Sequence, residues 1–497
     1  MQKFMSILPS ALLILVGIAL LLPANNGLIN FNKPYLLGVM ESLPEANPIV
    51  AFEHVKAIPM DNERMLADQT VIVREGIIDE IGASGEVRVP PGAQRIDGTG
   101  KYLLPGLVDM HVHIEDENDL LLYAANGVTT VRNLWGNSEL KLRIGMPNQL
   151  EMRDQIAGGE LFGPTIYTSG PIMEGDPPNS PLMPVVRSPE DAVKSIAWQK
   201  AQGYDLVKVY DNLSPETYAA VLQAARDHEM PVVGHVPFAV GLEAVMDGGQ
   251  VTIEHLSGYI DSDAGEFIIP EDQLADYAEL TQEAGVWNIP TIGLYQNTVP
   301  ADDVERLEAQ PGVEYFSPVM RVIMRMFIGQ LSASVTYAGE DYPERIEQIY
   351  LQTTRALNEA GAKVALGTDA TNSYLVPGFS LHDELGYLIQ AGFTPFEAIE
   401  AGTRNAAGAL GKSDEFGTIE PGKRADLILV SANPLDEVSH LRNREGVMLR
   451  GRWLTQASLQ ALLDDLAGSY TPTVIERLWP LGLVAVGVYL GLSRRAR

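Results

Sequence analysis

Apolar runs and amphipathic segments alternate through the middle of the chain, from residue 105 to residue 411. The runs are short enough for buried strands, and the segments that follow carry apolar residues three and four positions apart, as helices do. The eight runs are expected to end near His113, Asn133, Ser169, Tyr210, His235, His255, Thr291 and Asp369. Eight alternating strands and helices predict an α/β fold, a (β/α)8 TIM-like barrel with parallel strands.

The two flanks of this region show a different pattern, in which short apolar runs alternate with turn residues. Residues 69–76 (Gln-Thr-Val-Ile-Val-Arg-Glu-Gly) and 425–430 (Ala-Asp-Leu-Ile-Leu-Val) are examples. This alternation, with turn residues between the runs, predicts short strands that pair as hairpins. We therefore expect residues 47–104 and 412–455 to form one small β-sandwich domain beside a barrel of residues 105–411.

Long apolar runs occur near both ends of the chain. Lys3 precedes a run at 7–22, so residues 1–24 are interpreted either as a signal peptide cut near Ala24 or as an uncleaved membrane anchor. Residues 478–492 carry no charge, which predicts a C-terminal transmembrane helix over 474–493, with a terminal helix docked on the protein as the alternative. Arginines follow this run, and basic residues stay cytoplasmic. The expected location is therefore membrane-associated, with the catalytic domain extracytoplasmic, in the periplasm or at the cell surface.

The composition excludes several kinds of protein. The chain has no cysteine, which excludes a disulfide framework, an iron–sulfur cluster and a thiolate nucleophile. Its formal net charge of −30 disfavours nucleic acid as a partner. A hydrophobic fraction of 46% is sufficient for a large buried core, and the sequence leaves a homo-oligomer open.

Residues that can bind metal ions occur where the predicted strands end, which is the face at which such barrels carry their chemistry. His111 and His113 lie two apart on one strand, so both imidazoles point the same way and can reach one ion. Lys208 interrupts an apolar strand, where a lysine is costly unless it is neutral, paired or bound to metal. Three more strands end in His235, His255 and Asp369. Without thiolates, imidazoles and carboxylates predict a site for zinc or a similar divalent ion.

The first two histidines belong to the segment Pro105-Gly-Leu-Val-Asp-Met-His-Val-His113. This segment resembles the one that opens the barrel in the metal-dependent amidohydrolase superfamily, and the prolidase-like and imidazolonepropionase-related branch fits it best. The segment Gly417-Thr-Ile-Glu-Pro-Gly-Lys-Arg-Ala-Asp-Leu-Ile-Leu429 resembles the return of that superfamily to its small β domain. The resemblance covers about residues 47–455. It departs from the family at Arg132-Asn133, where many relatives carry Arg-Asp, and in the loop 170–182, where some relatives carry a histidine and this chain does not.

The resemblance implies a site with two divalent metal ions, and zinc is the expected metal. His111 and His113 would hold one ion, and His235 and His255 would hold the other. A carbamylated Lys208 would bridge the two ions. Asp369 would contact a metal and serve first as a base and then as an acid.

Such a site predicts a hydrolase that uses a metal-bound hydroxide to cleave a C–N amide bond in a small molecule, a cyclic amide or a dipeptide. A dipeptidase is one form of this prediction. Two alternatives stay open: a phosphotriester or lactone hydrolase on the same metal centre, and a non-catalytic, membrane-attached barrel that acts as a binding or scaffold protein. Tyr210 and His382 are candidates for substrate contacts, and both also fit structural roles.

Overall fold

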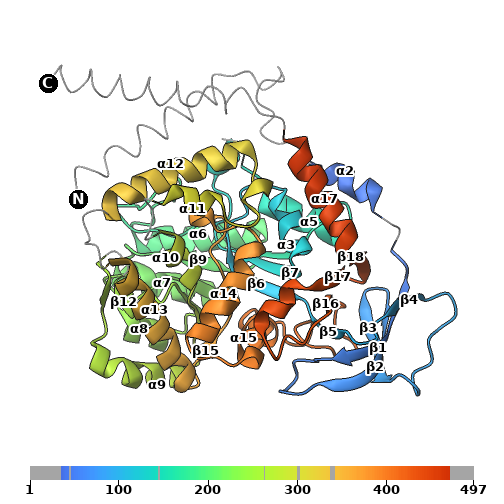
Figure 1. Ribbon diagram of the computed structural model, residues 1–497. Coiled ribbons are helices and arrows are strands. Elements are labelled where there is room, and N and C mark those ends of the chain that lie inside the picture. The colour runs from blue at the N-terminus through green and yellow to red at the C-terminus, as the bar shows by residue number, and fades with distance from the viewer. Residues whose placement is uncertain are drawn as a thin grey trace, which may run out of the picture.

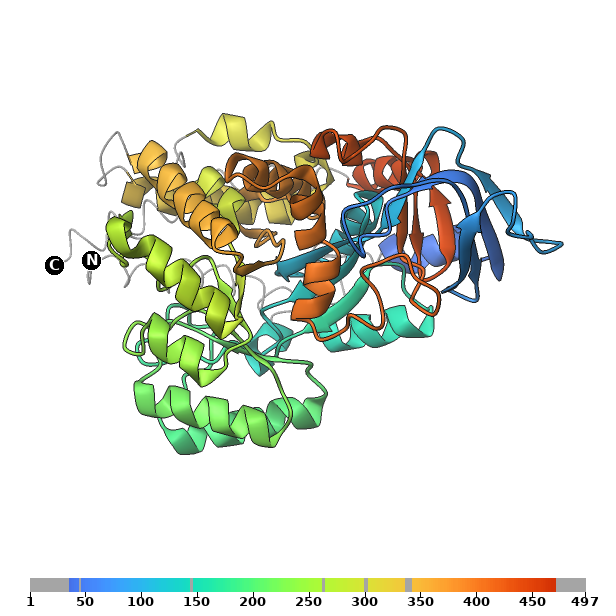
Figure 2. The same cartoon turned by 90° about the horizontal axis from the view of Figure 1, so that it is seen from below.

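The computed structural model describes residues 35–43, 46–143, 146–261, 264–298, 303–335 and 342–470. These residues form an α/β structure in which helices surround short parallel strands, with a larger sheet to one side of them (Figures 1 and 2). The larger sheet is called the flank sheet below, because its strands come from both flanks of the chain.

The flank sheet has eight strands in the order β18-β17-β16-β5-β1-β2-β3, and β4 pairs with β1. Its strands are β1 (Ile49–Ala57), β2 (Leu66–Arg74), β3 (Ile77–Ala83), β4 (Gln94–Asp97), β5 (Tyr102–Pro105), β16 (Leu427–Val430), β17 (Arg444–Leu449) and β18 (Arg452–Thr455). The N-terminal and C-terminal strands meet where β5 pairs antiparallel with β16, with Leu104 opposite Ile428. Residues far apart in the sequence therefore form one sheet.

The short parallel strands that the helices surround form two sheets. One has three strands (β6-β7-β8), and the other has five strands (β15-β14-β11-β10-β9). Their bounds are β6 (Leu107–Val112), β7 (Val128–Asn133), β8 (Thr165–Thr168), β9 (Val207–Val209), β10 (Val232–Gly234), β11 (Thr252–Glu254), β14 (Trp287–Ile289) and β15 (Lys363–Val364). Single parallel bridges join the two sheets at both seams, Ser169 with Leu206 and Val112 with Ala370. The described structure is thus α/β with eight parallel strands, and these strands pair as two sheets linked by single bridges, not as one closed sheet.

Helices connect the parallel strands, and their ends follow local sequence signals. Ser188 and Ser214 each accept a hydrogen bond from the third backbone amide of the helix that follows them, and a proline begins that helix. Gly203 ends the first of these helices in the left-handed conformation that favours glycine. The helices are α2 (Tyr35–Ser42), α3 (Asp119–Ala125), α4 (Glu139–Arg143), α5 (Gln149–Gly158), α6 (Pro189–Gln202), α7 (Pro215–Asp227), α8 (Leu242–Gly248), α9 (Leu274–Ala284), α10 (Ile292–Thr298), α11 (Val304–Glu308), α12 (Pro318–Val335), α13 (Tyr342–Glu359), α14 (Phe379–Gln390), α15 (Pro395–Ala401), α16 (Arg404–Ala409) and α17 (Gln456–Ser469). A short hairpin pairs β12 (Ile260–Asp261) with β13 (Glu266–Phe267).

The expected location at a membrane is corrected by the structure. Among the described residues, no helix combines the length and the apolar character needed to cross a bilayer. The two segments on which the prediction rested, 1–24 and 474–493, lie outside the described residues. The predicted membrane attachment and extracytoplasmic location are therefore withdrawn.

An aromatic pair stabilises the core of the flank sheet. Phe52 on β1 is completely buried, and its ring meets the ring of Trp453 on β18 edge to face, with the centroids 5.2 Å apart. The contact joins a strand from each flank of the chain, and pairs of this geometry are favourable beyond the area that they bury.

We predict that Phe52→Ala lowers the free energy of unfolding by about 3–5 kcal/mol, since it leaves a cavity the size of a benzyl group. Urea denaturation followed by circular dichroism measures this change. Phe238→Ala is the control, because Phe238 is 70% exposed and its removal leaves no cavity. Equal losses in the two variants would contradict the assignment of Phe52 to the core.

Candidate metal centre

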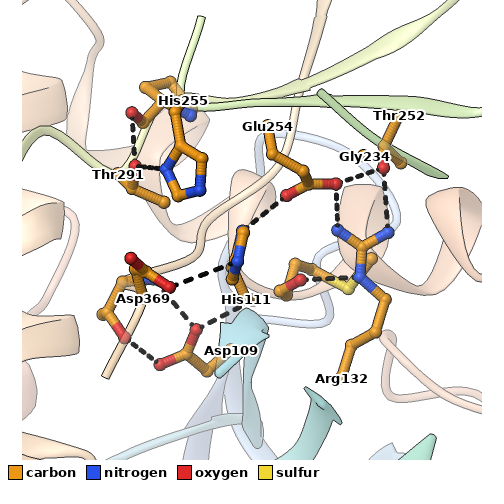
Figure 3. A network of polar contacts seen from close by, with 12 residues as sticks. Asp109, His111, Arg132, Gly234, Thr252, Glu254, His255, Thr291 and Asp369 are labelled. Carbon is orange, nitrogen blue, oxygen red and sulfur yellow. Dashed lines mark hydrogen bonds and ion pairs between the residues drawn. The ribbon is translucent and has the colours of Figure 1, made fainter. Parts of the chain in front are cut away.

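Two histidines and one aspartate form a group that can hold a metal ion. His111 lies on β6 and His113 directly after it, so strand alternation turns both side chains to the same face. The Oδ1 atom of Asp369, which follows β15, lies 3.2 Å from His111 Nε2 and 2.7 Å from His113 Nε2. One potential ligand atom from each residue falls within 4.8 Å of the others. Figure 3 shows the ring of His111 between the carboxylates of Asp369 and Glu254.

The other two predicted histidines lie beside this group. The ring of His255 lies 4.5 Å from that of His111, and the ring of His235 lies 5.0 Å from that of His255, measured between centroids. His235 follows β10 and His255 follows β11, so neighbouring parallel strands supply them. The structure thus brings all four predicted histidines together with Asp369.

Lys208 is a buried amine without a hydrogen-bond partner. It lies on β9 with 1% of its surface exposed, and no hydrogen-bond acceptor contacts its Nζ atom among the described residues. Burial lowers its pKa to about 8, although the charges of Glu254 and Asp369 act in the opposite direction. Burying an amine without a hydrogen-bond partner costs free energy. The Nζ atom of Lys208 is therefore suited to bind a group that the described residues do not supply.

Hydrogen bonds to the Nδ1 atoms orient three of the histidines. Each Nδ1 has one oxygen partner, in the pairs His111 with Glu254 at 2.8 Å, His235 with Asp211 at 2.6 Å, and His255 with Thr291 at 2.6 Å. An imidazole that donates from Nδ1 keeps the lone pair of Nε2 for a metal ion. Burial lowers the pKa of His111 to about 4, with a smaller effect of Lys208 in the same direction, and this favours the neutral ring that metal ions need.

Glu254 joins the first histidine to a buried arginine. Its Oε1 atom accepts hydrogen bonds from Arg132 Nη2 at 2.8 Å and from the Thr252 hydroxyl, while its Oε2 atom faces His111. Arg132 also donates from Nε to the carbonyl of Met110 at 2.6 Å. Burial raises the pKa of Glu254, but Arg132 and His111 outweigh burial and hold it below its ordinary range. The carboxylate is therefore ionised and fixes the ring that it contacts.

Asp369 is held as a carboxylate in an uncommon backbone conformation. Its φ angle is 70°, in the left-handed region, and Asn372 donates its side-chain amide to Oδ2 at 2.9 Å. Burial raises its pKa, but the imidazoles of His113 and His111 lower it below the ordinary range. His255 and Thr291 also have positive φ angles, of 59° and 50°. Such conformations cluster at functional sites, where the surrounding structure compensates for their cost.

The two predicted substrate contacts lie in different places. The ring of Tyr210 lies 4.0 Å from the ring of His235, so this tyrosine borders the histidine group. The Nε2 atom of His382, on α14, lies 3.0 Å from the carbonyl of Asn126 and 3.1 Å from Arg444 Nη1. Within the described residues, no recorded contact joins His382 to the histidine group, so the structure does not bring it to the site.

Sequence reasoning missed the oxygen partners of the histidines. Glu254 precedes His255, and Asp211 follows Tyr210, so both occupy strand ends that the barrel pattern had already marked. A search for carboxylates next to the candidate ligands would have found them. Thr291 gave no comparable signal, because a threonine at a strand end is common.

Glu384 supports the segment that carries Thr291. Its two carboxyl oxygens accept hydrogen bonds from the backbone amides of Ile292 and Gly293, each at 2.8 Å. The side chain is buried, and burial raises its pKa to about 8 despite these hydrogen bonds. The folded protein therefore holds a proton here that the unfolded chain releases at a lower pH.

We predict that this group makes the protein less stable as the pH rises. The pKa is raised on folding, so the stabilisation is complete below the unfolded pKa, near 4.3, and is lost as the pH rises through 8. The slope from one group is at most about 1.4 kcal/mol per pH unit. Glu384→Gln mimics the protonated acid, so urea titrations from pH 5 to 8 should show a flatter profile than for the wild type. Parallel profiles would show that Glu384 does not titrate in this range.

We predict that Asp211→Ala weakens metal binding by about 10–100-fold, since it removes the oxygen that orients His235. Competition with a chelator, followed by elemental analysis, measures the affinity. Asp276→Ala is the control, because Asp276 is an exposed acid on α9. The orienting role is wrong if both variants bind metal as the wild type does.

The chain is similar to known enzymes over most of its length. It is 21% identical to the ochratoxinase of Aspergillus niger over 82% of this chain and 86% of the relative. It is 25% identical to the imidazolonepropionase of Geobacillus sp. (strain WCH70) over 82% of this chain and 96% of the relative. These two relatives are matched over most of their length.

Solved structures agree in fold. A bottromycin amidohydrolase superposes with a TM-score of 0.71 at 23% identity, covering 90% of this chain and 95% of the other. A Xaa-Pro dipeptidase with bound methionine superposes with a TM-score of 0.62 at 22% identity, covering 82% and 100%. The family model described as "Amidohydrolase family" matches residues 102–454, which is more than half of the chain and includes all the residues of the candidate metal centre. With this match, the chain belongs to the amidohydrolase family.

Proposed function

We propose that this protein is a hydrolase with two metal ions that cleaves a C–N bond in a dipeptide, an amide or a cyclic amide. Members of its family act on C–N bonds, and the group of two histidines and Asp369 fits a metal ion. The observation that carries the proposal is the gathering of His235 and His255 beside this group, next to the unpartnered amine of Lys208.

The ligands divide into two sets. His111 and His113 would hold one ion, and His235 and His255 would hold the other. Zinc suits this donor set, since it is bound by imidazole and carboxylate and the chain has no cysteine. When bound, the two divalent ions would supply Lewis acidity that activates a water molecule near neutral pH.

Lys208 would bridge the two ions as a carbamate. The neutral amine would attack carbon dioxide, so that one N–C bond forms as one C=O π bond opens. An N–H proton would pass to solvent water, and the product would be a carbamate with a carboxylate group. Burial supports this role, because a pKa near 8 leaves a larger neutral fraction at neutral pH than an ordinary lysine has. Carbamylation would also give a bonded partner to the Nζ atom, which otherwise has none among the described residues.

Asp369 would move the proton of the reaction. Its carboxylate is ionised and buried, and it lies between the two histidines of the first set. It would accept the proton of the attacking water at Oδ1 and deliver it to the departing nitrogen. Tyr210, beside His235, would orient the substrate by its hydroxyl group.

The same proposal includes the arrangement of the domains. We infer that the eight parallel strands form a (β/α)8 barrel over residues 105–411, and that residues 47–104 and 412–455 form one β-sandwich domain. The bridges at both seams and the pairing of β5 with β16 support this inference. The cyclic-amide and dipeptide substrates are suggested by the names of the relatives, an imidazolonepropionase and a Xaa-Pro dipeptidase.

We predict that Lys208→Ala reduces turnover at least about 100-fold and leaves fewer than two metal ions per chain, since it removes the bridging group. Elemental analysis and a screen of dipeptides and cyclic amides measure these losses. Labelled carbon dioxide should give a carbamate signal in the wild type and none in this variant.

Lys141→Met is a matched control for this experiment. Lys141 is also buried, with 1% of its surface exposed and a pKa lowered to about 8 by burial, but its Nζ atom donates to the carbonyl of Trp135 at 3.0 Å. It should keep both ions. Normal turnover and two ions in Lys208→Ala would refute the two-metal mechanism.

A further inference from the structure

A second site lies between α12 and the turn after Asp369. The 3₁₀ turn η3 (Asn372–Tyr374) follows this aspartate, and α12 packs beside it. A cavity of about 280 Å³ lies here, and its lining residues are Glu308, Val313, Pro318, Arg321, Val322, Arg325 and Tyr374. None of the proposed metal ligands lines this cavity.

One arginine of the cavity is neutralised. Arg325 donates from Nε to Glu308 Oε1 at 2.6 Å and from Nη2 to Oε2 at 2.5 Å, which is a bidentate pair. The hydroxyl of Tyr374 donates to Oε1 of the same carboxylate at 3.1 Å. The charge of Glu308 is therefore balanced by Arg325, and these hydrogen bonds fix the carboxylate in place.

The charge of the other arginine, Arg321, is not balanced by a carboxylate of the described residues. Arg321 donates from Nη2 to the carbonyl of Glu314 at 2.7 Å and from Nε to the carbonyl of Phe316 at 3.3 Å. Both acceptors are neutral, and no carboxylate among the described residues pairs with Arg321. These two bonds hold the guanidinium group, while its Nη1 atom has no recorded acceptor in the described part of the chain. The cavity thus presents a fixed positive charge in a protein whose formal net charge is −30.

The remaining walls are apolar. Val313, Pro318 and Val322 line the cavity, and the ring of Tyr374 is completely buried. An arginine binds a carboxylate through its planar fork, and apolar walls favour a ligand with an apolar body. We propose that this cavity binds a small organic monocarboxylate about the size of benzoate, with its carboxylate on Arg321.

The carboxylate has two sources. It belongs either to the substrate or product of the proposed reaction or to a separate small acid. The metal centre is close in sequence, because Asn372, which begins η3, donates to Asp369 Oδ2, and Tyr374 ends the same turn. Binding at Arg321 does not rest on the proposed function, and only the choice between these sources does.

Titration calorimetry on the full-length, zinc-loaded protein tests the proposal. Benzoate should bind at one site per chain, and benzamide, its neutral analogue, should bind at least tenfold more weakly. Arg321→Gln should weaken benzoate by about 10–100-fold, the range expected for charge-assisted hydrogen bonds, and should leave benzamide unchanged. Arg143→Gln is the control, since Arg143 is an exposed arginine paired with Glu139 on α4.

Val322→Phe provides a second variant that keeps both arginines. It should fill the cavity and abolish the binding of benzoate and benzamide alike, with circular dichroism confirming the fold. Benzoate affinity that is unchanged in Arg321→Gln would place the ligand elsewhere, at the metal ions among other sites, and would overturn the proposal. The same holds if benzoate does not bind.

Inhibition kinetics separate the two sources. If benzoate competes with a substrate that the enzyme turns over, the cavity is part of the substrate site. If benzoate binds and turnover stays unaffected or falls without competition, the cavity takes a separate acid. If no tested substrate is turned over, the calorimetric result still stands, so failure of the proposed function and failure of the cavity proposal are distinguishable.

Discussion

The contacts of the buried Glu254 carboxylate are the interaction on which the candidate metal centre depends. The carboxylate contacts His111 from β6 and Arg132 from β7, and it lies itself on β11, so one side chain connects three strands. Burying the Glu254 carboxylate and the Arg132 guanidinium group is costly unless each is well paired. Here Arg132 is well paired, because it also donates a hydrogen bond to a backbone carbonyl. The neighbouring residue, His255, is placed by the same strand. This arrangement holds the candidate ligands in place at the strand ends.

Much of the fold could be predicted from the sequence, because strand alternation is a local property. The first seven parallel strands end within two residues of the predicted positions, as β7 does at Asn133 and β11 beside His255. The eighth strand, β15, ends at Val364, and the chain reaches Asp369 through a segment with a positive φ angle at that residue. Apolar residues continue past the end of this strand, so the pattern alone does not show where pairing stops.

The site was predictable where its members share a strand or a strand end, and less so where distant segments meet. His111 and His113 follow from alternation, but the contact between His111 and Glu254 joins residues 143 positions apart. His382 shows the converse. It follows strand eight in the sequence, yet α14 directs it toward Asn126 and Arg444, because a helix pattern does not tell which buried neighbour a polar residue will meet.

The pairing of β5 with β16 has a consequence for how the chain folds during synthesis. Leu104 on β5 pairs with Ile428 on β16, which lies more than three hundred residues later in the chain. During synthesis, the edge of β5 that faces β16 therefore has no partner until those residues have left the ribosome. Contacts of such sequence separation form slowly, and an unpaired strand edge can associate with other chains in the meantime. The N-terminal strands of the flank sheet are therefore where newly made chains would need protection by a chaperone.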